Sequence, residues 1–463
     1  MLDPQDWKAF RDDAHRALDA AFDALETVRD RPVWQDVPAD VRARFAEPMP
    51  LAGEPLSDVI AEFQSTIAPY PTGNQHPRFF GWVHGSATPS AALADALAGL
   101  FDANLGGRDH AAVYVERQVV RWFCDLFGQP AGAGGLFTVG TSAANLLAVV
   151  AARGRGGADA SMVGYASAAA HGSVRKAFET AGLGAAALRT IATDAEHRID
   201  VAALEAAIAR DRADGLRPFI VIGCAGTVGI GATDPLDALA TIAARERLWF
   251  HVDGAFGALG ALAPSLRESV RGIERADSIA FDFHKWLRVP YDAGCLIARD
   301  PKRLSDAFSA GDAYLARAER GPAGGAPWFA DLGIDLSRGF RALKVWFALK
   351  EHGATALGAS IERNVALAQR LRDLVDADPM LERLAPVPLN VVCFRYKAPG
   401  LDAAALDAFT DELAMLIAES GRAVVSTLPL PQGRALRVCI TNHRTEDADL
   451  DELLAAVHAC ANA

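Results

Sequence analysis

A lysine and an aspartate follow two mostly apolar segments of the chain, and Lys285 comes 32 residues after Asp253. The segment 248–252 leads into Asp253, and the segment 278–283 leads into His284 and Lys285. Apolar runs of this length predict buried strands, and ligands of an open α/β sheet bind beyond the carboxyl ends of its strands. A lysine amine there can bond covalently to an aldehyde cofactor, while an aspartate holds a pyridinium nitrogen. Each residue alone also has a plain explanation, since lysines extend from strand ends and aspartates cap helices.

The elements that must position these two residues follow an alternating pattern. Strands are expected at about 161–166, 218–225 and 293–298, and helices at about 173–181 and 200–213. Strands that are apolar throughout and alternate with helices indicate a mostly parallel sheet that is covered by helices. The predicted fold class is therefore α/β.

A glycine turn opens another helix, which runs from about Thr141 to Arg153. Thr141 and Ser142 stand at its start, where free backbone N–H groups and hydroxyls suit a phosphate. Any capped helix has a similar start, so this pattern alone is a weak signal.

Two further regions flank the predicted sheet. Asp3 and Pro4 suit the N-cap and first residue of a long amphipathic helix, and the proline-punctuated stretch that follows has no core of its own. Short strands and helices after residue 388 predict a small α+β domain. The expected parts are an N-terminal helical arm at 1–77, a large cofactor-binding domain at 78–345 and a small C-terminal α+β domain at 346–463.

Two motifs resemble the group II pyridoxal-phosphate decarboxylases, which include the aromatic-L-amino-acid decarboxylases. They are Asp-x-Ala-Phe at 253–256 and His-Lys-Trp at 284–286. His76-Pro-Arg-Phe-Phe80 and the segment 338–346 are similar to two further family motifs. The resemblance implies fold type I, with pyridoxal 5′-phosphate (PLP) bonded to Lys285 and its ring nitrogen held by Asp253.

The same resemblance implies a wider set of cofactor contacts. His171 matches a family histidine that stacks on the cofactor ring, and Thr227 is expected to face the cofactor. Asp282 stands where aromatic-specific relatives carry asparagine near the phosphate, and its role stays open. The expected cofactor-binding residues are Thr141, Ser142, His171, Thr227, Asp253, Ala255, His284 and Lys285.

Tyr314 lies 29 residues after Lys285, the spacing expected for the tyrosine on the family's mobile catalytic loop. The Gly/Pro-rich segment 319–327 behind it is typical of a flexible lid. The expected catalytic residues are therefore Lys285, His171 and Tyr314, with Tyr314 delivering the proton that replaces carbon dioxide. Relatives with phenylalanine there form aldehydes by oxidative deamination, so a tyrosine favours plain decarboxylation.

The substrate pocket is expected at Trp82, Val83 and His84, which follow the His76-to-Phe80 motif. These residues favour an aromatic amino acid. Arg108 leaves an alternative open, because it either pairs with the second carboxylate of an acidic substrate or forms a structural ion pair, for example with Asp109.

The composition and charge of the chain limit the kinds of partner that it could bind. A net charge of −12 and a pI near 5.4 argue against nucleic acid and anionic membranes. Six cysteines without C-x-x-C spacing indicate reduced thiols and no metal site, and favour the cytoplasm. The resemblance implies a homodimer clasped by the N-terminal arm. Less favoured alternatives are a carbon–carbon lyase of the sphingosine-phosphate-lyase kind and an inactive scaffolding relative.

Overall fold

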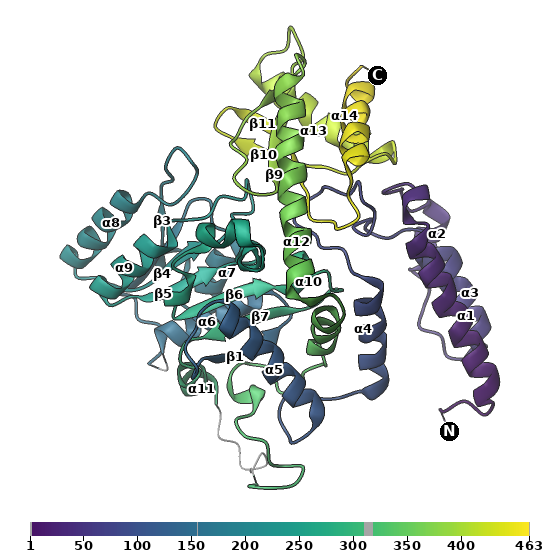
Figure 1. The fold of residues 1–463 in the computed structure, drawn as a ribbon, viewed down its shortest axis with the longest axis horizontal. Coiled ribbons are helices and arrows are strands. Elements are labelled where there is room, and N and C mark those ends of the chain that lie inside the picture. The colour runs from purple at the N-terminus through teal and green to yellow at the C-terminus, as the bar shows by residue number, and fades with distance from the viewer. Residues whose placement is uncertain (1, 155, 310–317, 463) are drawn as a thin grey trace. The chain divides into compact units, whose positions relative to one another are not determined.

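The computed structural model describes residues 2–154, 156–309 and 318–462. These residues form two compact units (Figure 1). The large unit comprises residues 85–369 and 385–392, and the small unit comprises the chain up to residue 84, residues 370–384 and the chain from residue 393 on. The N-terminal residues thus belong to the same unit as the C-terminal ones. The division into three parts stays a prediction.

The large unit is built on a seven-stranded sheet in the order β1-β7-β6-β5-β4-β2-β3. The run from β3 through β6 is parallel, whereas β7 is antiparallel to both of its neighbours. The strands are β1 (Gly134–Thr138), β2 (Met162–Ser167), β3 (Leu188–Ile191), β4 (Arg217–Cys224), β5 (Trp249–Asp253), β6 (Ser278–Asp282) and β7 (Gly294–Ala298). The mostly parallel α/β sheet expected from the sequence is confirmed.

Helices pack against this sheet. Helix α6 contacts β4 to β7 and lies beside α7, and α8 and α9 pack against β4. The helices of the large unit are α4 (Pro89–Phe101), α5 (Ala111–Leu126), α6 (Thr141–Arg153), α7 (Gly172–Thr180), α8 (Val201–Ala213), α9 (Leu236–Glu246), α10 (Phe283–Trp286), α11 (Lys302–Phe308) and α12 (Ala342–Ala377), the last of which continues into the small unit. Gly353 kinks α12, with a φ of 74°.

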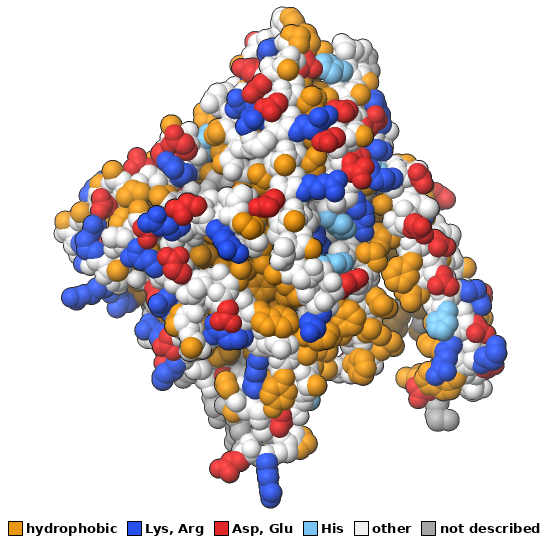
Figure 2. All heavy atoms as spheres, viewed as in Figure 1, with side chains coloured by type: hydrophobic (Ala, Val, Ile, Leu, Met, Phe, Trp, Pro, Cys, Tyr) orange, Lys and Arg blue, Asp and Glu red, His pale blue; other side chains and the backbone are white. Residues whose placement is uncertain are grey.

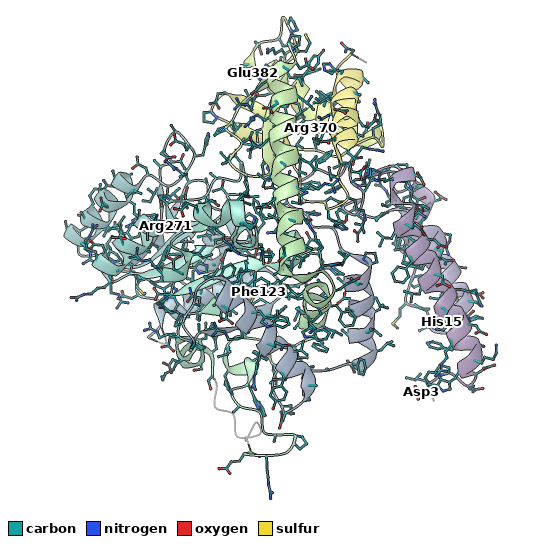
Figure 3. The ribbon with its side chains drawn as sticks, viewed as in Figure 1. Asp3, His15, Phe123, Arg271, Arg370 and Glu382 are labelled. Atoms are coloured by element: carbon teal, nitrogen blue, oxygen red, sulfur yellow. The ribbon has the colours of Figure 1, made fainter. Side chains whose placement is uncertain are left out.

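An aromatic cluster fixes the end of β6 that leads to Lys285. The ring of Phe123, labelled in Figure 3, lies 5.4 Å from that of Phe281 and 4.8 Å from that of Phe283. All three side chains are buried. Burying a phenylalanine contributes about 1.5–3 kcal/mol, so the turn after β6 is anchored by well-packed side chains.

A buried ion pair ties α5 to β1. Nη2 of Arg338 lies 2.6 Å from Oε1 of Glu116, with side chains 1% and 0% exposed. The same carboxylate oxygen accepts a hydrogen bond from the N–H of Phe137 at 3.0 Å, and Arg338 donates to the carbonyl of Phe137 at 2.7 Å. Strand β1, which leads to Thr141, is therefore held by two buried charges.

The small unit contains a four-stranded sheet in the order β10-β11-β9-β8. Its elements are α1 (Trp7–Glu26), α2 (Ala39–Arg44), α3 (Leu56–Glu62), β8 (Leu381–Arg383), β9 (Val391–Tyr396, which begins in the large unit), α13 (Ala403–Glu419), β10 (Ser426–Leu430), β11 (Gly433–Cys439) and α14 (Asp447–Ala461). The predicted cap at Asp3 is wrong. Asp6 caps α1 instead, because its carboxylate accepts the N–H groups of Lys8 and Ala9.

Among the described residues, no helix combines the length and hydropathy that a bilayer crossing requires.

Candidate active site

Lys285 lies in α10, the single helical turn directly after β6. Its Nζ is 2.9 Å from Oδ2 of Asp282, and the two side chains are 19% and 4% exposed. Oδ1 of Asp282 accepts the N–H of Thr141 at 2.7 Å, and Nε2 of His284 lies 3.6 Å from Oδ2. The fold thus brings together Lys285, the buried carboxylate of Asp282 and the start of α6.

The start of α6 has the features of a phosphate site. The Oγ1 atom of Thr141 is buried and has no hydrogen-bond partner among the residues that the structure describes, while Ser142 is exposed. A Cβ atom on Gly294 would lie 2.5 Å from Cα of Gly140, so only glycine lets β7 approach this turn. A buried hydroxyl at a helix N-terminus, with a lysine nearby, fits the phosphate of PLP.

Asp253 ends β5 with its side chain buried. Burial raises the pKa of the Asp253 carboxyl, while a hydrogen bond from Asn145 and the positive charge of Lys285 oppose this shift. Nδ2 of Asn145 donates to Oδ2 of Asp253 at 2.9 Å, and the N–H of Ala255 donates to Oδ1 at 3.2 Å. Such a carboxylate, surrounded by donors, suits a pyridinium nitrogen.

His171 is the N-cap of α7. Its Nδ1 atom accepts the N–H of Ser173 at 3.1 Å and lies 2.8 Å from the Oγ of Ser173. The ring is otherwise exposed. Among the described residues, Ser173 is thus the partner that orients this exposed ring.

Residues 38–397 match the pyridoxal-dependent decarboxylase conserved domain. The chain is 32% identical to an aromatic-L-amino-acid decarboxylase of Bacillus atrophaeus over 455 residues. The aligned region covers 96% of this chain and 94% of that protein. The chain belongs to the pyridoxal-dependent decarboxylases. It is an amino-acid decarboxylase, and its cofactor is pyridoxal 5′-phosphate.

Crystal structures agree with this assignment. The chain superposes on Oryza sativa TDC with PLP and tryptamine with a TM-score of 0.91 at 26% identity, covering 100% of this chain and 99% of that one. It superposes on Rhodiola rosea 4-hydroxyphenylacetaldehyde synthase with a TM-score of 0.89 at 26% identity, covering 99% of each chain.

Thr227 and His284 of the decarboxylase, two further residues predicted to bind the cofactor, accept hydrogen bonds that close loops. The Oγ1 of Thr227 accepts the N–H of Ala232 at 3.1 Å. The Nδ1 of His284 accepts the N–H of Ala293 at 3.0 Å, and burial lowers the pKa of this histidine. Both hold their turns in place, and their contacts to the cofactor stay predictions.

Arg108 of the decarboxylase lies over an aromatic ring. Its guanidinium carbon is 5.0 Å from the ring centroid of Trp328, and the residue has a φ of +91°. Among the described residues it forms no ion pair with Asp109, whose carboxylate accepts the hydroxyl of Tyr114 at 2.5 Å. Within the described residues the contact of its guanidinium is thus a cation–π stack, and its role towards the substrate stays a prediction.

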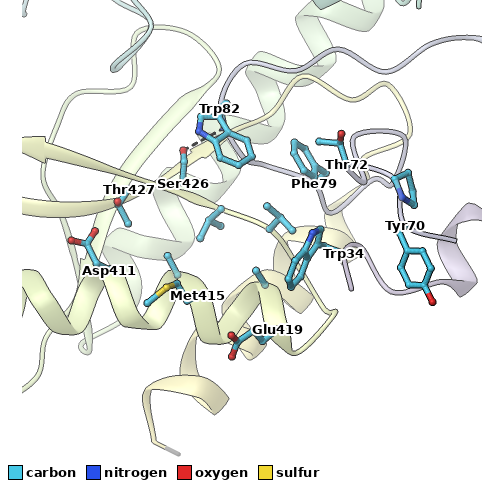
Figure 4. Close-up of a pocket in the computed structure, with 15 residues that line it drawn as sticks. Trp34, Tyr70, Thr72, Phe79, Trp82, Asp411, Met415, Glu419, Ser426 and Thr427 are labelled. Atoms are coloured by element: carbon cyan, nitrogen blue, oxygen red, sulfur yellow. Dashed lines mark hydrogen bonds between the residues drawn. The ribbon is translucent and has the colours of Figure 1, made fainter. Parts of the chain in front are cut away.

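The predicted substrate residues Trp82, Val83 and His84 lie in the small unit. Trp82 lines a cavity of about 850 Å³ that also includes Trp34 and Phe79 (Figure 4). Phe79 stacks on the ring of His84, with centroids 5.6 Å apart, whereas Val83 is buried. The three residues thus have different environments, and their contact with substrate stays a prediction. Tyr314 lies outside the described residues.

Sequence reasoning missed three residues behind Asp253, namely Asn145, His251 and Ser278. The sequence carries one signal. His251 stands two positions before Asp253, and alternate side chains of a strand point to the same face. Ser278 is the neighbour of His251 across the β5–β6 pair, a register that only the structure shows. Asn145 is a buried polar residue one helical turn after Thr141.

Proposed function

We propose that this decarboxylase removes the α-carboxylate of an aromatic L-amino acid and releases the amine and carbon dioxide. The observation that carries the proposal is the pair formed by Lys285 and Asp253, which neighbouring parallel strands deliver to one end of the sheet. The names of the relatives support the substrate class, since they include aromatic-L-amino-acid, tryptophan and tyrosine decarboxylases.

Each residue has a proposed task in this reaction. Lys285 would hold the cofactor through a covalent bond, and Thr141 and Ser142 would hold its phosphate. Asp253 keeps a proton on the ring nitrogen, because its buried carboxylate favours a cationic neighbour. PLP supplies, when bound, a ring that accepts the electron pair of the breaking Cα–carboxylate bond.

The proton that replaces carbon dioxide must come from a positioned acid. His171 would stack on the cofactor ring and orient it, and the N–H of Ser173 holds Nδ1 of this histidine. Tyr314 is proposed as the donor, on the strength of its spacing from Lys285 alone. A tyrosine at this position favours amine formation over the aldehyde synthase outcome.

Arg108 supports an aromatic rather than an acidic substrate. A guanidinium that stacks on Trp328 at 5.0 Å already has a structural role. It also lies on a loop that bonds to the segment before Trp328, since the N–H of Asp109 donates to the carbonyl of Pro322 at 3.2 Å.

The decarboxylase is further proposed to work as a homodimer in the cytoplasm. Helix α1 has no buried residue in the single chain, although Trp7, Phe10 and Leu18 are apolar. A second copy would cover these side chains. Six free cysteines support a reducing compartment.

The test is a panel of L-amino acids incubated with the PLP-loaded protein, with amine and carbon dioxide measured in each case. We expect tryptophan, tyrosine or phenylalanine to give both products in equal amounts. Arg108→Ala should lower the rates on all substrates alike. A protein that is active on glutamate or aspartate, and that loses only this activity in Arg108→Ala, would show that the substrate is acidic.

A further inference from the structure

A network of polar side chains leads from the partly buried Trp249 at the start of β5 to Asp253 at its end. The indole Nε1 of Trp249 lies 2.8 Å from the Oγ of Ser278, which lies 2.8 Å from Nδ1 of His251. Nε2 of His251 lies 2.9 Å from Oδ1 of Asn145, whose Nδ2 donates to Asp253 at 2.9 Å. His251 and Asn145 are 0% exposed, and Ser278 is 1% exposed. Polar atoms buried this deeply are costly unless every one of them is paired.

The direction of each hydrogen bond follows from the two ends of this network together with a neutral imidazole. An indole N–H only donates and a carboxylate only accepts, so Ser278 accepts from Trp249 and the NH₂ group of Asn145 points to Asp253. The carbonyl oxygen of Asn145 then faces Nε2 of His251, which must carry a proton. In a neutral imidazole Nδ1 therefore accepts the hydroxyl hydrogen of Ser278.

The protonation state of His251 agrees with this geometry. Burial lowers the pKa of His251 to about 4. The neutral ring therefore persists at neutral pH, and no second positive charge competes with the cofactor for Asp253.

Asn145 also reaches His171. Its Nδ2 lies 3.2 Å from the Oγ of Ser173, and this hydroxyl lies 2.8 Å from Nδ1 of His171. One amide group thus donates both to the residue expected at the ring nitrogen and to the residue that orients the ring-stacking histidine.

We propose that Asn145, oriented by His251, is a positioning residue that keeps Asp253 ionised and directed at the ring nitrogen of PLP. The inference rests on the role proposed above for Asp253. Asn145 supplies a neutral donor where a charged one would compete with the cofactor. His251, Ser278 and Trp249 prevent the amide from turning its oxygen towards the carboxylate.

Matched substitutions of His251 test the proposal. The amide nitrogen of glutamine reaches the position of Nε2 and can still donate to Asn145, whereas the shorter side chain of asparagine cannot. His251→Gln should therefore behave like the wild type, and His251→Asn should behave like Asn145→Leu. Both His251 variants bury an amide, so a general loss of packing would affect them alike.

The main measurement is the ¹⁵N NMR shift of the ring nitrogen in holoenzyme loaded with ¹⁵N-labelled PLP, recorded against pH. In His251→Asn and Asn145→Leu the nitrogen should lose its proton at a pH lower by at least about one unit. The dissociation constant for PLP should rise by about tenfold or more in the same two variants. His251→Gln should show neither change.

The variant Asp253→Asn distinguishes a failure of the role proposed for Asp253 from a failure of the role proposed for Asn145. If that variant keeps the wild-type ¹⁵N titration, the role proposed for Asp253 fails. If Asp253→Asn loses the ring proton while the Asn145 and His251 variants match the wild type in both measurements, the positioning role of Asn145 is wrong and that of Asp253 stands.

Discussion

At the scale of single residues, Asp282 distinguishes this chain from the asparagine expected in aromatic-specific relatives. Its carboxylate accepts the N–H of Thr141 and lies beside Lys285 and His284. The N–H of Thr141 would otherwise be available to a phosphate. A buried carboxylate at the phosphate end of the cofactor site repels a phosphate dianion, and Lys285 offsets part of this repulsion.

Asp282→Asn is therefore expected to tighten PLP binding by about tenfold or more, since it removes one negative charge within a few ångströms of the phosphate site. The dissociation constant can be measured by titrating stripped protein with PLP and following tryptophan fluorescence. Asp300→Asn is a matched control, because Asp300 is exposed and its carboxylate accepts the N–H of Lys302 on the surface. Weaker binding in Asp282→Asn would mean that this carboxylate organises the site.

At the scale of elements, the sequence predicted the strands and helices that carry the main candidates, including β5, β6 and α6. It missed β1, because Gly134 and Gly135 suggest a loop. A Cβ atom on Gly135 would lie 1.9 Å from the carbonyl oxygen of Leu296 in β7. This glycine permits close pairing with a strand about 160 residues later in the chain, which no local pattern reveals.

The polar contacts between these elements could not be predicted from the sequence either. Asn145, His251 and Ser278 come from three elements, and only the β5–β6 register and the packing of α6 bring them together. Glu116 likewise gains its role from Arg338, 222 residues away. Side chains that meet through the topology of the sheet could be predicted only once that topology was known.

Arg338→Met should destabilise the protein by about 3–5 kcal/mol, because it leaves Glu116 buried without a counter-charge. Urea unfolding measures the change. Adding Glu116→Gln should restore part of the stability, since no buried charge then remains. Arg341→Met is the control, as its pair with Asp292 is partly exposed and should contribute at most about 1 kcal/mol. Equal losses in Arg338→Met and the control would contradict the role given to the buried pair.

At the scale of the whole molecule, the N-terminal arm is the part least explained by a single chain. Orange apolar side chains lie between charged ones along α1 and α3 in Figure 2. An isolated helix depends on packing for most of its stability, and α1 buries none of its residues. A second copy of the chain is the partner that we propose.

Replacing Phe10 and Leu18 together by aspartate should weaken the dimer at least about 30-fold, because two charges would enter an apolar contact. Sedimentation equilibrium measures the dissociation constant. The control replaces Lys8 and Arg16 by aspartate, since their side chains on the same helix are 87% and 69% exposed. If both double variants dimerise like the wild type, α1 lies outside the interface.

The central claim is that Lys285 is the residue that holds PLP. Borohydride reduction of the PLP-loaded protein fixes the covalent link between cofactor and lysine, and mass spectrometry of its peptides then locates the modified residue. We expect the pyridoxyl group on the peptide that contains Lys285, and its absence from that peptide in Lys285→Ala. A pyridoxyl group on another lysine, or none in the wild type, would contradict the account.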